Sequence, residues 1–193
     1  MVKFIKKNEN RVKKIYKNRY GFLKEQDLKH EGFSEKVIDF CSDISWYKTS
    51  DYELDNVKNH CGAILVCNLC KYLLKETKDI FKDVHFSVGN GPILHLNRLA
   101  KRYFKKGNYQ LQVNKVDSID DYILAINENR PVSFLLSSGI NDFHWVMGIG
   151  YRKYENGDFY IKIVDGWHSD SLSYFMANKG SLWISSFKYH IKK

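Results

Sequence analysis

The sequence lacks the features that would place the protein in a membrane or in a disulfide-rich secreted class. No stretch approaches the roughly 20 apolar residues that span a bilayer, and the basic N-terminus is not followed by the apolar region of a secretion signal. Four cysteines in 193 residues do not form the disulfide framework of a small secreted domain. We therefore expect a reduced protein with no membrane partner. A cytoplasmic location is the default expectation, with secretion as the alternative if a signal peptide was removed.

The chain also lacks motifs for nucleic-acid and nucleotide binding. The formal net charge is +9, but the densest basic stretch, Lys3–Lys17, belongs to a polar N-terminal arm. No nucleic-acid motif accompanies the lysines. The Gly89–Gly91 cluster lacks the Lys and the Ser or Thr of a phosphate-binding P-loop. We therefore expect solvated lysines and no nucleic-acid partner.

The composition is that of one folded domain. Hydrophobic residues make up 44% of the chain and aromatic residues 15%, which is far from the composition of disordered proteins. We expect residues 1–30 to form a basic arm or a helix laid over the domain. Residues 31–193 are expected to form a single domain with one core.

Apolar spacing predicts helices in the first two thirds of the chain. In Ser34–Ile44 the apolar residues recur at i, i+3, i+4 and i+7, which favours an amphipathic helix. Cys61–Lys75 is apolar on almost every side and is predicted to be a buried central helix. Further helices are expected over Ile93–Phe104, with Pro92 in its first turn, and over Ser118–Asn129, with Ser118 as the N-cap.

The last third of the chain has the alternating pattern of strands. Residues 132–138, 144–154 and 158–167 each alternate, and Asn156 and Gly157 between the last two indicate a hairpin. A strand over Tyr109–Val113 and short strands within Ser181–Tyr189 complete the set. Helices followed by an antiparallel sheet give an α+β layout.

Cys61 is the candidate nucleophile. It begins the predicted central helix and is followed by the small residues Gly62 and Ala63. A thiol at a helix N-terminus meets unpaired N–H groups and the positive end of the helix dipole, which predicts a lowered pKa. The same N–H groups are suited to stabilise an oxyanion. Considered alone, Cys61 would more often be a buried small hydrophobe.

His144 and Asp165 are the candidate base and its orienting group. Both flank the predicted hairpin, and an odd register places them on one face. A strict two-residue loop would separate them too far, so we predict a wider loop or a bulge, with Arg152 opposite Phe159 and Asp165 opposite Val146. The glycines between them, at positions 148 and 150, are expected to let the central helix approach.

Three segments resemble a known family. NHCGAILVCN, FHWVMGIGY and YIKIVDGW are similar to papain-like cysteine peptidases, particularly the bacterial C39-like group. The resemblance covers about Asn59–Trp167. It implies a papain-like fold, a peptide or related acyl substrate, no metal and no organic cofactor. It also implies Cys61 as nucleophile, His144 as base and Asp165 as the orienting residue.

The sequence departs from this family at the oxyanion donor. Papain-like enzymes usually carry a Gln about six residues before the Cys, and none is present here. Asn59 is the favoured replacement and Asn56 the alternative. Without such a donor, peptidase activity is in doubt.

Three functions remain open at this point. The first is hydrolysis of a peptide or related amide through a Cys61 thioester, and the second is acyl transfer from the same thioester to an amine. The third is a catalytically silent peptide-binding module. Three neighbouring residues are assigned to other places: Cys67 and Cys70 to the core rather than to zinc, and His60 to the rim of the site. Trp145 and Trp167 either line the substrate cleft or belong to the core.

Overall fold

The computed structural model describes residues 20–52, 59–91, 93–140, 142–167, 172–177 and 182–192. Within these ranges the chain is α+β, with four α-helices and an antiparallel sheet of seven strands. None of the helices in the described ranges has the length and apolarity needed to cross a membrane.

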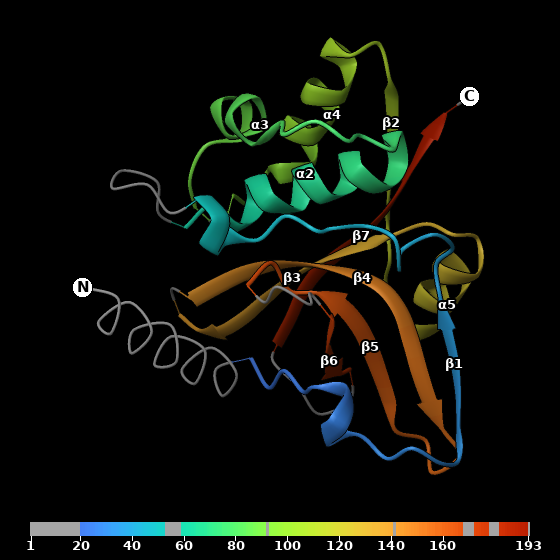
Figure 1. Cartoon of the computed structure of the whole chain (residues 1–193). Helices are drawn as coiled ribbons and strands as arrows, with labels where there is room; N and C mark the ends of the chain where they lie inside the picture. The colour runs from blue at the N-terminus through green and yellow to red at the C-terminus, as the bar shows by residue number, and fades with distance from the viewer. Residues whose placement is uncertain are drawn as a thin grey trace.

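Three helices form a layer over the sheet, with α2 nearest to the strands (Figure 1). They are α2 (Cys61–Leu74), α3 (Phe81–Val88) and α4 (Leu96–Lys106). A fourth helix, α5 (Ile119–Asn127), lies beside the far end of the sheet, next to β1. Nearly every residue of α2 is buried, as its all-round apolar sequence predicts.

The strands follow the order β2-β7-β3-β4-β5-β6, and β1 pairs with β4. The strand β4 is long, so β3 pairs with its first half and β1 with its second half, while β5 occupies the other edge. Two short 3₁₀ helices flank β1 in the sequence: η1 (Glu25–Asp27) precedes it and η2 (Thr49–Tyr52) follows it. The strands are β1 (Phe33–Val37), β2 (Gln110–Lys115), β3 (Val132–Gly139), β4 (Asp142–Tyr154), β5 (Phe159–Val164), β6 (Leu172–Met176) and β7 (Leu182–Lys192).

Most predicted elements are present. The central helix begins at Cys61, and Ser118 caps α5 by accepting a hydrogen bond from the N–H of Asp121 at 3.0 Å. The hairpin of β4 and β5 turns at Asn156 and Gly157, and Gly157 has a φ of 88°. The helix α4 starts three residues later than expected, and Pro92, predicted in its first turn, lies outside the described residues. The predicted C-terminal strands are one long strand, β7.

The helix predicted over Ser34–Ile44 is wrong. Residues Phe33–Val37 form the strand β1 and the rest of the segment is irregular. The reason is tertiary: β3 pairs with β4 only as far as Val132 opposite Gly148, which leaves an open edge that β1 fills from Gly150 onward. Pairing with that edge satisfies backbone groups that a short helix would satisfy by itself. The helix α3, by contrast, has no counterpart among the predicted elements.

Candidate active site

Cys61 lies at the first position of α2 and is 7% exposed. Burial raises the pKa of its thiol, against the opposing effect of backbone hydrogen bonds from Trp145, Gly62 and Cys61 itself. The sequence predicts a lowered pKa, and this prediction is wrong because desolvation of the thiolate outweighs the backbone donors.

The backbone donor at Trp145 places the sulfur of Cys61 beside the peptide bond that joins His144 to Trp145. The Trp145 side chain points toward the helical layer, where its Nε1 donates to the carbonyl of Ile93 at 3.3 Å. It is 2% exposed, so Trp145 belongs to the core rather than to an open cleft. Successive strand residues alternate faces, so the side chain of His144 leaves β4 on the other face.

The imidazole of His144 is held by a backbone carbonyl. Its Nε2 lies 2.7 Å from the carbonyl oxygen of Asp165. A carbonyl only accepts hydrogen bonds, so Nε2 carries the proton and Nδ1 of the neutral ring has the lone pair. No described residue hydrogen-bonds to Nδ1. The tautomer is therefore the one in which Nδ1 is the basic nitrogen.

Aromatic rings enclose the same imidazole. The Trp167 ring stacks on it with centroids 3.7 Å apart and an interplanar angle of 18°. Tyr20 and Phe22, from the segment before η1, pack against it at 5.6 and 6.4 Å between ring centroids. Burial lowers the pKa of His144 to about 4, although the hydrogen bond and the charge of Asp165 act in the opposite direction. The ring is therefore neutral near pH 7.

Asp165 is fully buried and its carboxylate stabilises the turn that follows β5. Its Oδ1 accepts a hydrogen bond from the N–H of Trp167 at 2.8 Å, and its Oδ2 accepts one from the hydroxyl of Ser173 at 2.6 Å. The sequence predicts that Asp165 orients His144. The imidazole instead donates to the main-chain carbonyl of Asp165, while the carboxylate accepts from the N–H of Trp167.

A bulge in β4 brings these residues together. Met147 pairs with Val164 and Gly148 with Ile163, and the register then shifts by one residue before Gly150. This confirms the predicted bulge. The predicted pairing of Arg152 with Phe159 is wrong, because Arg152 pairs with Tyr160 on the hairpin side of the shift. On the site side, continuing the register places Asp165 beside Val146.

The two glycines of β4 do not serve the predicted approach of the central helix. A Cβ at position 148 would lie 2.7 Å from the Phe134 ring and 2.8 Å from the Tyr122 hydroxyl, so this glycine admits a side chain of α5. A Cβ at position 150 would lie 2.6 Å from the carbonyl oxygen of Lys36, so this glycine admits β1. The predicted role of both glycines is therefore wrong.

Cys61 lies beside the backbone of His144, but its thiol and the imidazole do not interact within the described part of the chain, because the imidazole leaves β4 on the opposite face. The interactions of the Cys61 thiol are with backbone groups, and those of the imidazole are with Asp165 and the aromatic rings. With the thiol pKa raised and the imidazole pKa near 4, the resting pair is thiol and neutral imidazole. General-base activation of the thiol requires the imidazole to turn to the face of β4 on which the sulfur lies.

The favoured side-chain oxyanion donor, Asn59, is not in place. Asn59 has an exposed side chain and a φ of 57°, and its main-chain carbonyl accepts a hydrogen bond from Gly91. Asn56 lies outside the described residues. The donors that do face the sulfur are the backbone N–H groups of Gly62 and Trp145. The N–H group of Gly62 could be predicted from the small residue after Cys61, whereas that of Trp145 reaches the sulfur only through the fold.

Of the predicted positions of His60, Cys67 and Cys70, the first is wrong and the other two are confirmed. His60 is 2% exposed, with Nε2 3.2 Å from the Thr49 carbonyl, so its predicted place on the rim is wrong. Cys67 and Cys70 are buried core residues, as predicted, and burial raises both thiol pKa values, that of Cys70 to about 12. No group of metal-ligating side chains occurs within the described residues.

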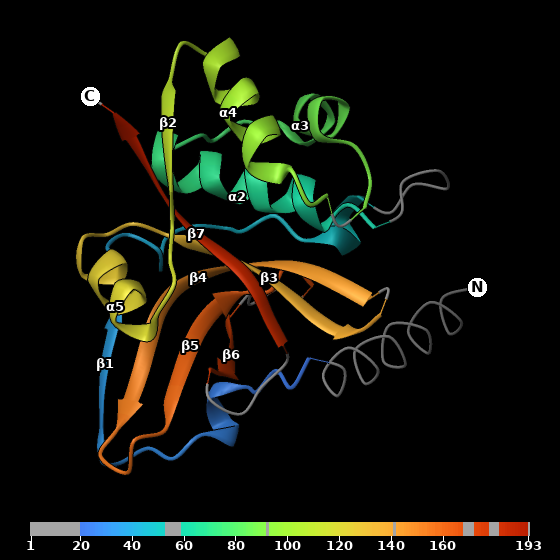
Figure 2. The same ribbon diagram turned by 180° about the vertical axis from the view of Figure 1, so that it is seen from behind.

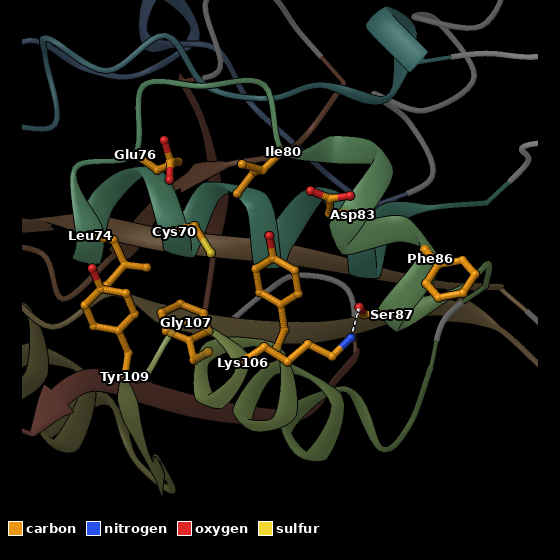
Figure 3. Close-up of a pocket in the computed structure, with 12 residues that line it drawn as sticks. Cys70, Leu74, Glu76, Ile80, Asp83, Phe86, Ser87, Lys106, Gly107 and Tyr109 are labelled. Atoms are coloured by element: carbon orange, nitrogen blue, oxygen red, sulfur yellow. Dashed lines mark hydrogen bonds between the residues drawn. The ribbon is translucent and has the colours of Figure 1, made fainter.

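A separate pocket of about 380 Å³ lies between α2, α3 and α4 (Figure 3). Its wall includes Cys70 and Leu74 of α2, and Lys106 closes one side by donating to the Ser87 hydroxyl at 3.1 Å. The candidate catalytic residues do not line it. The pocket and the candidate active site are therefore distinct features.

No protein-family model matches the chain, and no characterised protein matches it significantly.

Proposed function

We propose that the chain is a thiol hydrolase of the cysteine-peptidase type that cleaves a peptide or related amide bond. In the reacting state the imidazole of His144 turns toward the sulfur and accepts the thiol proton at Nδ1 as Cys61 attacks the carbonyl carbon, and that proton then passes to the leaving amine. A thioester remains on Cys61. Water, deprotonated by His144, hydrolyses the thioester and regenerates the thiol.

The observation that carries this proposal is the position of the Cys61 sulfur. It lies at a helix N-terminus, against the N–H groups of Gly62 and Trp145, beside the backbone of a histidine held in one tautomer. The same N–H groups are suited to receive the oxyanion that forms when the sulfur attacks. Nucleophile and donors thus meet at the peptide bond that joins His144 to Trp145, and the base is the side chain of the first of these two residues.

A catalytically silent peptide-binding module is the second candidate. It is favoured by the raised thiol pKa and by the exposed side chain of Asn59, which leaves the oxyanion to backbone donors alone. The two candidates differ in whether Cys61 is acylated with the help of His144.

Acylation by 4-nitrophenyl acetate tests the proposal. The protein is quenched in acid after short incubation, and the acetyl adduct is located by peptide mass spectrometry. We expect an adduct on Cys61, and a rate at least about 100-fold lower in His144→Ala, because the general base is lost. Cys67→Ala is the matched control and keeps the wild-type rate. Acetylation that is equally fast in His144→Ala, or that does not prefer Cys61, would favour the silent module.

A further inference from the structure

A basic groove of about 500 Å³ lies between α4 and the end of the sheet formed by β2 and β7. In Figure 2, α4 and β2 are on the same side of the molecule, and the two elements are in contact. One wall is α4, the other includes Lys115 of β2, and Val113 and Phe187 form an apolar floor. None of these residues belongs to the candidate active site.

The wall of α4 carries four cations on one face. Arg98, Lys101, Arg102 and Lys105 recur at i, i+3, i+4 and i+7, and all four are exposed. The apolar residues Leu96, Ala100 and Phe104 occupy the opposite, buried face. The charge is therefore concentrated along the groove rather than distributed around the helix.

These four charges have no partners within the described part of the chain. None of them forms an ion pair there, and α4 contains no acidic residue. Like charges four residues apart on a helix are destabilising by a few tenths of a kcal/mol per pair, about 0.2–0.5. The arrangement costs stability, and its uncompensated positive charge attracts anionic ligands.

We propose that this groove binds an extended acidic polypeptide segment. On α4, Arg98 and Arg102 form one pair of charges four residues apart, and Lys101 and Lys105 form a second, so the charges of each pair are about 6 Å apart along the helix axis. Side chains on one side of an extended chain are spaced by about 6.8 Å, so acidic residues at every second position match them. The strand β2 lies at one edge of the sheet, so a peptide backbone can also pair with its outer side.

Two other polyanions fit the groove less well. Proteins that bind single-stranded nucleic acid stack successive bases on several aromatic side chains, and this groove is lined by a single aromatic residue, Phe187. A helix that lies on a membrane directs an apolar face into the lipid, whereas the apolar face of α4 is in the protein core. The spacing of the charges and the strand edge at β2 favour a polypeptide.

As a statement about substrate class, the inference rests on the proposed hydrolase, since the acidic segment would then belong to the protein that is cleaved. The binding itself requires neither Cys61 nor His144. A Cys61→Ala variant therefore separates the two proposals: it abolishes acylation and leaves acidic-peptide binding unchanged.

Fluorescence anisotropy with the full chain tests the groove. The probe is a short labelled peptide in which Glu alternates with Thr, measured at low salt. We expect Arg102→Glu combined with Lys105→Glu to weaken binding at least about tenfold, because two attractions become repulsions. The matched control, Lys29→Glu combined with Lys153→Glu, changes the net charge equally at exposed positions elsewhere and is expected to weaken binding less than about twofold.

Three outcomes would overturn the proposal. The first is equal weakening in the two double variants, which would indicate attraction by net charge alone. The second is equally tight binding of a peptide with Gln in place of Glu. The third is tighter binding of labelled oligothymidylate or of phosphatidylserine vesicles, lost in the Arg102 and Lys105 double variant, which would assign the groove to nucleic acid or to a membrane.

Discussion

The imidazole of His144 is kept neutral by its surroundings. It is 3% exposed, stacked on Trp167, and in contact with Tyr20 and Phe22. Transferring an imidazolium into such an environment is unfavourable, which lowers the pKa to about 4 from an ordinary value of 6.5. The neutral ring donates from Nε2 to a carbonyl and leaves Nδ1 unprotonated.

This pKa shift predicts a pH-dependent stability. Between pH 4 and 6.5 the unfolded chain binds a proton at His144 that the folded chain does not, so the stabilisation is complete above 6.5 and is lost as the pH falls. The loss is expected to be roughly 3 kcal/mol from this residue. Urea unfolding of the wild type and of His144→Gln, which keeps an N–H donor for the Asp165 carbonyl, measures it. An equal decrease in both proteins would contradict the prediction.

Sequence reasoning at the residue scale proposed Cys61, His144 and Asp165 as the site but did not predict their contacts. The start of a buried helix is visible locally, so the position of Cys61 could be predicted. The acceptor for His144 could not, because Asp165 offers both a carboxylate and a carbonyl, and the choice depends on Trp167 and Ser173 binding the carboxylate. The enclosure by Tyr20 arises from a segment more than a hundred residues away in sequence, which no local pattern reveals.

At the scale of elements, β4 changes its register and its partners at one point. The bulge between Gly148 and Gly150 coincides with the place where β3 ends and β1 begins along the same edge. The spacing of His144 and Asp165 required such a bulge, so it could be predicted. The strand β1 could not, because its sequence fits a helix equally well and only the vacant edge of β4 decides between the two.

Gly150 is expected to be intolerant of any side chain. A Cβ there would lie 2.6 Å from the Lys36 carbonyl oxygen, a backbone atom that moves only if β1 moves. Gly150→Ala should lower the free energy of unfolding by about 2 kcal/mol or more, as overpacking does in well-packed regions. Gly139→Ala is the control, since a Cβ at that position meets no atom within 4 Å. Denaturant unfolding of both variants measures the difference. Similar free energies of unfolding would show that β1 can shift to accommodate the added Cβ at little cost.

At the scale of the whole molecule, one buried guanidinium connects the N-terminal segment to the sheet. Arg152 is 2% exposed and donates to Glu35 at 2.7 Å and to Glu25 at 2.9 Å. Its guanidinium also lies 4.1 Å from the centre of the Phe33 ring. These partners belong to η1 and β1, whereas Arg152 belongs to β4. The same N-terminal segment carries the rings of Tyr20 and Phe22 that cover His144. Arg152 therefore connects the segment that covers His144 to the strand β4.

Removing Arg152 should therefore loosen the N-terminal segment before the rest of the protein. In Arg152→Ala, Glu35 keeps only Lys162, 3.0 Å away, as its ion-pair partner within the described residues. Breaking a buried ion pair from one side costs about 3 kcal/mol or more.

We expect faster amide hydrogen exchange across residues 20–37, little change in α2, and near wild-type exchange in the control Lys153→Ala, whose side chain is exposed. Because Tyr20 and Phe22 move with that segment, the pKa of His144 should rise toward 6.5 in the same variant. A uniform increase in exchange over the whole chain would instead show that the segment and the sheet unfold as one unit.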